Sequence, residues 1–176
     1  MKVYLIRHAE ATHNVNNNYG IFDPQLTPKG IQQSKDKSTN NDLQYVNLVI
    51  SSTAHRTLET AKYIFPNKSI YATDLLLEYN TGVNCNKRNE LNIQKKRFSD
   101  VDFEKYRSDP LPIETHWNQG DERASKVMNI LKEVKEEGYQ SVALVTHFNF
   151  MRHLFIALSG EDNTNVANCQ HFCFDL

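Results

Sequence analysis

Two histidines and two arginines lie at or just beyond the ends of three apolar segments of the chain. Arg7 and His8 follow the first segment, Arg56 lies one turn beyond the second, and His147 follows the third. A guanidinium group binds phosphoryl oxygens bidentately, and an imidazole nitrogen can attack phosphorus and carry the phosphoryl group covalently. A single histidine after a strand is more often structural, but the coincidence at three segments predicts phosphoryl transfer.

A bound metal ion is the main alternative for a cluster of histidines. Two adjacent arginines would repel a divalent cation, and no carboxylates cluster as further ligands at the ends of these segments. We therefore expect neither a metal ion nor another cofactor at this site.

The three apolar segments are Val3–Ile6, Leu48–Ile50 and Val142–Val145. Each is unbroken rather than alternating, which is typical of strands buried on both faces of a parallel sheet. Open sheets of this kind bind ligands at the carboxyl ends of their strands. The sheet would therefore bring the histidines and arginines together at one edge.

Stretches of helical periodicity separate these strands. Thr27 suits an N-cap, because proline occupies the first helical position after it. We expect helices over residues 28–37, 53–64, 120–138 and 150–158, and a last strand over residues 171–175. The alternation predicts an α/β fold in a single domain, residues 1–176, in which residues from about 80 to 119 form a loop-and-helix cap.

The composition fits one globular domain, with 176 residues, 39% hydrophobic and 23% charged. A net charge of −1 provides no global field for nucleic acid or an anionic membrane surface. No segment is apolar enough for a membrane span or a signal peptide, so we expect a cytoplasmic protein. Three cysteines without a CxxC pair indicate reduced thiols. A monomer and an oligomer are both compatible with the sequence.

Several motifs resemble those of the histidine phosphatase superfamily, also called the phosphoglycerate mutase-like family. Residues 5–10, Leu-Ile-Arg-His-Ala-Glu, followed by Asn14, resemble its RHGExxxN signature. Further matches, in the family's order, are Leu26-Thr27 with Gly30 and Gln32; Ser51-Ser52 with Arg56, Glu59 and Thr60; Leu77-Glu78 with Gly82; Gly120 with Glu122; and Val145-Thr146-His147.

The resemblance implies a role for each matching residue. It implies that His8 is the nucleophile, that Glu78 is the proton donor, and that the phosphate pocket is formed by Arg7, Arg56 and His147, with Asn14 at its periphery. It also implies a three-layer α/β/α sandwich around a mostly parallel central sheet, with a small cap insertion and no required metal.

Two positions depart from the family pattern. Ala9 replaces the glycine after the first histidine, which adds one methyl group. Phe148 and Asn149 replace the small residues that follow the second histidine, where backbone approaches the phosphate or substrate. Phe148 would therefore line the phosphate pocket and could narrow it, alter specificity or weaken catalysis.

These observations together predict a metal-independent phosphatase that hydrolyses a small phosphorylated molecule through a phosphohistidine on His8. Three alternatives stay open: phosphoglycerate mutase-type transfer, a protein phosphohistidine phosphatase, and a non-catalytic phosphate-binding relative. A basic cluster in the expected cap could hold a second anionic group of the substrate or form a solvated helix face; its members are Lys87, Arg88, Lys95, Lys96 and Arg97.

Overall fold

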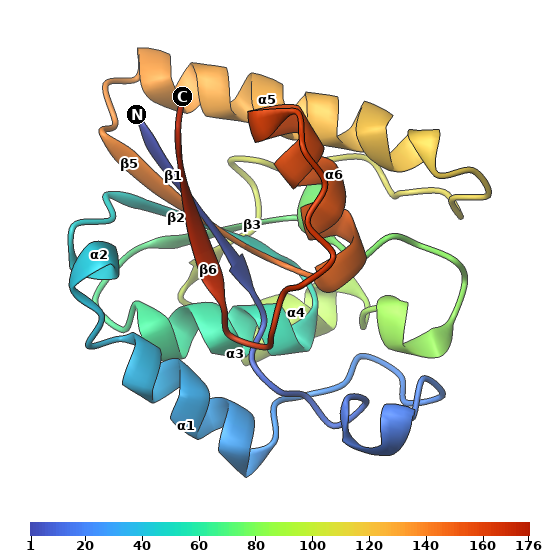
Figure 1. Ribbon diagram of the computed structural model, residues 1–176. Coiled ribbons are helices and arrows are strands. Elements are labelled where there is room, and N and C mark those ends of the chain that lie inside the picture. The colour runs from blue at the N-terminus through green and yellow to red at the C-terminus, as the bar shows by residue number, and fades with distance from the viewer.

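A computed structural model describes all residues, 1–176, as a six-stranded sheet with helices on both faces (Figure 1). The strands lie in the order β4-β3-β2-β5-β1-β6, and every neighbouring pair is parallel except β1 and β6. Their bounds are β1 Lys2–Arg7, β2 Leu48–Ser52, β3 Ile70–Thr73, β4 Val101–Asp102, β5 Ser141–Thr146 and β6 His171–Asp175.

The three apolar segments form adjacent central strands, as predicted. β5 lies between β1 and β2, with Leu5 in register with Leu144 and Ile50 also in register with Leu144. All three strands run in the same direction, so their carboxyl ends meet at one edge of the sheet. This arrangement places the residues that follow them, including His8 and His147, at a common site.

The helices form two layers, with the sheet between them, and this confirms the predicted α/β/α sandwich (Figure 1). One core packs the sheet against α1 and α3, and includes Leu58 and Ile64. The other packs it against α5 and α6, and includes Leu131 and Leu154. The helices are α1 Pro28–Lys37, α2 Asn41–Gln44, α3 His55–Ile64, α4 Leu91–Arg97, α5 Asn118–Glu136 and α6 Phe148–Ser159, with short 3-10 turns η1 Val15–Asn17, η2 Asp74–Leu76 and η3 Asn84–Asn86.

The helix boundaries follow local signals in the chain. Thr27 caps α1 as predicted, because its hydroxyl oxygen accepts a hydrogen bond from Gly30 N at 3.0 Å. α3 begins at His55, two residues later than expected, and α6 begins at Phe148, two residues earlier. His147 is therefore the N-cap of α6, and the N-terminus of that helix faces the site.

The segment from 80 to 119 is more closely joined to the sheet than the expected loop-and-helix cap. It contains β4, which extends the sheet through the pairs Ile70 with Val101 and Tyr71 with Asp102. Its last two residues already belong to α5. A strand of two residues is too short to produce an alternating pattern, so residues 101–102 carry no recognisable strand signal.

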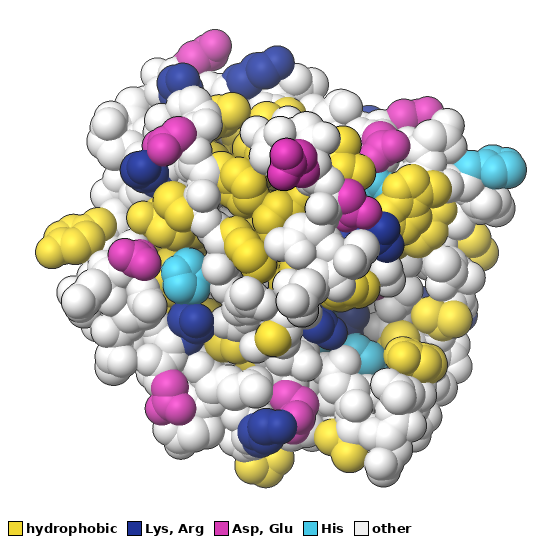
Figure 2. Space-filling model, in the orientation of Figure 1, with side chains coloured by type: hydrophobic (Ala, Val, Ile, Leu, Met, Phe, Trp, Pro, Cys, Tyr) yellow, Lys and Arg dark blue, Asp and Glu magenta, His cyan; other side chains and the backbone are white.

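Acidic and basic side chains are interspersed on the face shown in Figure 2, in keeping with the small net charge. The thiols of Cys85, Cys169 and Cys173 are unpaired. No helix combines the length and apolar character that crossing a membrane requires.

Candidate active site

The carboxyl edge of the sheet brings together the histidines and arginines that the sequence predicts there. The rings of His8, after β1, and His147, after β5, have centroids 5.2 Å apart. Arg56 is the second residue of α3, which begins three residues after β2. These three side chains are almost fully buried, with 2%, 0% and 1% of each residue exposed.

His8 presents a free ring nitrogen. Its backbone N–H donates to Thr146 O at 2.9 Å, which fixes the residue beside β5. Its Nδ1–H donates to Ala9 O at 2.8 Å, so Nε2 carries the lone pair. Burial, and next the charges of Arg56 and Arg7, hold the pKa of His8 well below its usual value. His8 is therefore a neutral imidazole whose Nε2 can act as a nucleophile.

The two arginines are anchored on backbone carbonyls and keep other N–H groups free. Arg7 Nη1 donates to Val166 O at 2.6 Å, and Arg56 Nη1 donates to Cys85 O at 2.9 Å. The Nε atoms of both residues are buried without a hydrogen-bond partner. Burial lowers the pKa of Arg56 to about 10, so its guanidinium stays charged at neutral pH. Unpartnered, charged N–H groups of this kind fit a bound oxyanion.

His147 presents a hydrogen-bond donor rather than a lone pair. Ser52 Oγ accepts from Ala54 N at 3.3 Å and lies 2.9 Å from His147 Nε2. The serine hydroxyl has no other hydrogen-bond acceptor, so we assign its hydrogen to Nε2, which places the ring proton on Nδ1. Nδ1 is buried and has no partner. Burial, followed by Arg56 and His8, holds the pKa of His147 well below its usual value, so this donor is neutral.

Glu78 lies at the N-terminus of α6, where backbone N–H groups hold its carboxylate. Oε1 accepts from Tyr79 N and Phe150 N, each at 2.8 Å, and Oε2 accepts from Asn149 N at 3.1 Å. Its negative charge raises the pKa values of Arg7 and Arg56, opposing the effect of burial. The carboxylate is thus within electrostatic reach of both arginines.

Asn14 and Phe148 support the site in ways that their sequence positions alone do not reveal. Asn14 Oδ1 accepts from Ala11 N at 3.0 Å, so the side chain orders the loop after β1. The guanidinium carbon of Arg7 lies 5.0 Å from the centre of the Phe148 ring. Phe148 therefore contacts the arginine of the pocket through a cation–π interaction.

Two residues of the matched motifs, Gln32 and Glu122, make no hydrogen bond to a neighbouring element. In each case the adjacent residue in the chain makes such a bond instead. Gln32 donates to Asp36 at the surface, while Gln33 Oε1 accepts from Glu10 N at 2.9 Å. Glu122 is exposed, while Asp121 accepts a hydrogen bond from His153 Nδ1 at 2.7 Å. A shift of one residue on a helix turns a side chain by about 100°, and spacing alone did not separate these neighbours.

Two further residues near the site, His13 and Arg123, belong to none of the matched motifs. The ring of His13 lies 5.6 Å from that of His8, and burial, followed by Arg56 and Arg7, lowers its pKa to about 3. The buried residue Arg123 ion-pairs with Glu114. One signal pointed to Arg123: it lies four residues before Val127, on the apolar stripe of α5.

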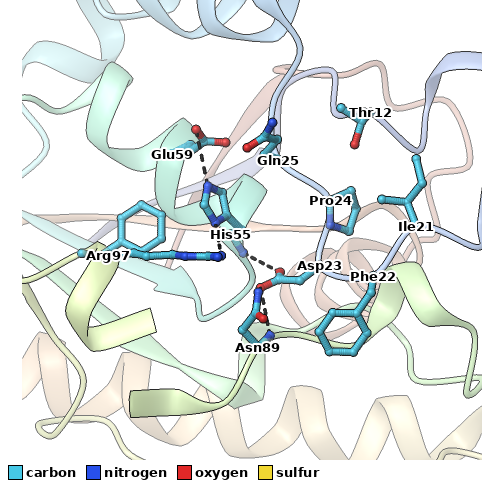
Figure 3. Close-up of a pocket in the computed structure, with 11 residues that line it drawn as sticks. Thr12, Ile21, Phe22, Asp23, Pro24, Gln25, His55, Glu59, Asn89 and Arg97 are labelled. Atoms are coloured by element: carbon cyan, nitrogen blue, oxygen red, sulfur yellow. Dashed lines mark hydrogen bonds and ion pairs between the residues drawn. The ribbon is translucent and has the colours of Figure 1, made fainter. Parts of the chain in front are cut away.

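A cavity of about 790 Å³ lies beside the site (Figure 3). None of the predicted site residues lines this cavity. His55, which precedes Arg56, lies at its centre, with Glu59 and Arg97 on one side and Asp23 on the other. Asp23 Oδ1 accepts from His55 N at 2.9 Å at the start of α3. A carboxylate at a helix N-terminus is favourable, and here it fixes the turn that carries Arg56.

Comparison with known proteins gives consistent matches over almost the whole chain. The family model of the histidine phosphatase superfamily (branch 1) matches residues 3–174. The chain is 29% identical over 170 residues to phosphoserine phosphatase 1 of Hydrogenobacter thermophilus, covering 92% of this chain and 78% of that protein. It is 26% identical over 221 residues to phosphoglycerate mutase-like protein 1 of Arabidopsis thaliana, covering 97% of this chain and 77% of that protein.

Solved structures share the fold. The α-ribazole phosphatase from Shigella flexneri matches with a TM-score of 0.72 and 19% identity, covering 100% of this chain and 91% of that chain. A mutant phosphoserine phosphatase from Entamoeba histolytica, in complex with phosphoserine, matches with a TM-score of 0.69 and 20% identity, covering 99% of this chain and 90% of that chain.

Proposed function

Because the chain belongs to the histidine phosphatase superfamily, branch 1, we propose that it is a phosphatase that hydrolyses small phosphorylated molecules through a phosphohistidine on His8. The observation that carries this proposal is the free Nε2 of a neutral His8 beside two arginines with unpartnered N–H groups. The phosphoserine phosphatase 1 of Hydrogenobacter thermophilus, at 29% identity, supports a phosphate monoester as substrate.

In the first step, the Nε2 lone pair attacks phosphorus as the bond from phosphorus to the leaving oxygen breaks. Arg7, Arg56 and the Nδ1–H of His147 donate to the phosphoryl oxygens and stabilise the charge of the transition state. Glu78 gives its proton to the leaving oxygen. In the second step, Glu78 takes a proton from water, the water oxygen bonds to phosphorus, and the bond from phosphorus to Nε2 breaks.

Oε2 is the Glu78 atom best placed to carry that proton. It accepts one backbone hydrogen bond, at 3.1 Å, whereas Oε1 accepts two at 2.8 Å. The first step requires the proton to be on Oε2 when the leaving group departs. The second step needs water and uses the protein's own residues for proton transfer and charge stabilisation.

The phosphoenzyme is the test of the nucleophile. A radiolabelled aryl phosphate should label the protein, and the label should be lost in acid and retained in base, because a phosphoramidate bond is acid-labile. Labelling should disappear in His8→Ala and persist in a matched control, His116→Ala, which changes an exposed histidine. Label that survives in His8→Ala would refute the assignment. Turnover should persist in excess chelator; its loss, with recovery on adding a divalent ion, would contradict the metal-independent mechanism.

The leaving group is the test of the proton donor. Glu78→Gln should lower kcat/KM for alkyl phosphates by about 100-fold or more, because an alkoxide leaves poorly without a proton. Aryl phosphates with acidic phenols should lose much less kcat/KM, since this quantity reports the first step and not the shared hydrolysis of the phosphoenzyme. Equal losses on both substrates would show that Glu78 positions the substrate or supports the fold.

A further inference from the structure

A buried ion pair lies directly behind Glu78. Arg123 of α5 and Glu114 of the preceding loop form a bidentate pair, with Nε to Oε1 and Nη2 to Oε2 both at 2.9 Å. Each side chain is only 4% exposed. The pair is among the most deeply buried charged groups of the protein outside the phosphate pocket, and the mechanism above does not use it.

Arg123 donates hydrogen bonds to the backbone of the segment that carries Glu78. Its Nη1 donates to Leu75 O at 3.0 Å and to Leu77 O at 2.6 Å, and its Nη2 donates to Glu78 O at 3.4 Å. Three carbonyls of one short segment therefore converge on one guanidinium group. These bonds fix the direction in which the Glu78 side chain leaves the backbone.

Glu114 is hydrogen-bonded to the other end of the same segment, at Asn80. Its Oε2 accepts from Asn80 N at 2.6 Å, and its own backbone N–H donates to Asn80 O at 2.8 Å. The ion pair thus joins both ends of residues 75–80 to α5 and to the loop before it.

Arg123 also contacts the element that binds the Glu78 carboxylate. Its guanidinium carbon lies 3.7 Å from the centre of the Phe150 ring. The backbone N–H of Phe150 is one of the two donors to Glu78 Oε1. One side chain therefore touches both the segment that carries the carboxylate and the helix turn that receives it.

Stability alone does not account for this pair. A buried ion pair is expensive to desolvate, and apolar residues of similar volume are often as stable or more so. Arg123 occupies a position on the apolar stripe of α5, with Ala124 and Val127 beside it on the same face. What the pair provides, and an apolar residue could not, is hydrogen bonds to three carbonyls and one N–H of the Glu78 segment.

We propose that Arg123 and Glu114 are positioning residues that hold the Glu78 proton donor against the leaving oxygen. The inference rests on the proposed function, since it requires Glu78 to be the donor. The role is tested in the first step, where Glu78 protonates the leaving oxygen. A misplaced donor slows phosphoryl transfer to His8 from substrates with poor leaving groups, and it has much less effect where an acidic phenol departs without needing a proton.

The test compares kcat/KM for an alkyl phosphate with kcat/KM for an aryl phosphate of an acidic phenol. The variants are Arg123→Gln, Glu114→Gln and the double variant. Each single change leaves an unpaired buried charge and can prevent folding, whereas the double variant removes both charges. In the folded double variant the alkyl-to-aryl ratio should fall by about 10-fold or more, with the aryl value within about 3-fold of wild type.

Leu131→Ala is the matched control for a general loss of stability. Leu131 lies on the same helix and is fully buried, but it makes none of these contacts. It should lower the melting temperature and leave the ratio unchanged. A fall of the ratio in Leu131→Ala equal to that in the double variant would overturn the proposal.

Glu78→Gln separates failure of this inference from failure of the proposed function. If Glu78→Gln lowers the ratio and the folded double variant retains the wild-type ratio, the positioning role is refuted while the donor stands. If Glu78→Gln leaves the ratio unchanged, both are refuted. When the double change is added to Glu78→Gln, no further fall of the ratio should occur, because the donor is already absent. A further fall would also refute the positioning role.

Discussion

His8 and His147 carry their ring protons on the same atom but present opposite groups to the site. In His8 the Nδ1–H is used by Ala9 O, so the lone pair of Nε2 is free. In His147 the lone pair of Nε2 is used by Ser52, so the Nδ1–H is free. One imidazole can therefore attack phosphorus while the other donates to an oxygen, and a single hydrogen bond to each ring makes the difference.

The buried histidines also make stability depend on pH. Burial and two arginine charges lower the pKa of His13 from 6.5 to about 3, so the unfolded chain binds a proton there at pH values where the folded chain does not. Folding is then favoured above pH 6.5 and loses stability as the pH falls from 6.5 toward 3.

His13→Gln should reduce this acid sensitivity. Between pH 7 and pH 5, its free energy of unfolding should fall by about 1 to 2 kcal/mol less than that of wild type, since one depressed group is removed. Urea unfolding at the two pH values measures this difference. His116→Gln, an exposed position, should behave as wild type. An equal fall in His13→Gln and wild type would show that His13 is not the cause.

At the level of elements, the site depends on how closely α5 and α6 approach each other. A β-carbon added to Gly120 would lie 2.3 Å from His153 Nε2. The ring of His153 is also stacked against Trp117, with centroids 3.9 Å apart, and hydrogen-bonded to Asp121. Glycine is therefore required by packing between the helices rather than by backbone conformation.

Gly120→Ala separates packing from helix propensity by the sign of its effect. Propensity alone would stabilise the helix by about 0.5 to 1 kcal/mol, whereas the collision with His153 should destabilise the protein by about 1 to 3 kcal/mol. Urea unfolding decides between them. Ser125→Ala, at an exposed position of α5, should stay within about 0.5 kcal/mol of wild type. A stabilised Gly120→Ala protein would mean that the helices move apart at little cost.

Across the whole molecule, three of the basic residues of the segment 80–119 have partners or positions outside the predicted phosphate pocket. Arg88 is paired with Asp74 at 2.6 Å, Lys95 is paired with Glu104, and Arg97 lines the separate cavity beside His55. A mutase must hold an intermediate with a second anionic group while shielding its phosphoenzyme from water. The placement of these charges favours hydrolysis instead.

Incubation with 3-phosphoglycerate should accordingly give inorganic phosphate faster than 2-phosphoglycerate. Phosphorus NMR of one reaction mixture follows both products. Arg88→Gln should leave the ratio of the two products unchanged, because Arg88 is committed to Asp74. Isomer formation well above phosphate release would refute the assignment to hydrolysis.

Several features of this protein follow from its sequence. The apolar segments at 3–6, 48–50 and 142–145 predicted buried strands, and the structure confirms that they are parallel neighbours whose carboxyl ends share one edge of the sheet. Thr27 before proline determined where α1 begins. These signals are local or periodic, so they can be read from the order of the residues.

The tertiary structure decided the features that depend on contacts between distant residues. It determined that Asp121 rather than Glu122 bonds to His153, and that Gln33 rather than Gln32 bonds to the backbone of Glu10. It also added β4 to the edge of the sheet and placed the Arg123–Glu114 ion pair behind Glu78. It also determined which nitrogen of each imidazole is free. Hydrogen-bond partners that lie far apart in the chain, such as Arg7 and Val166, are brought together only by packing, and the spacing of residues along the chain contains no record of them.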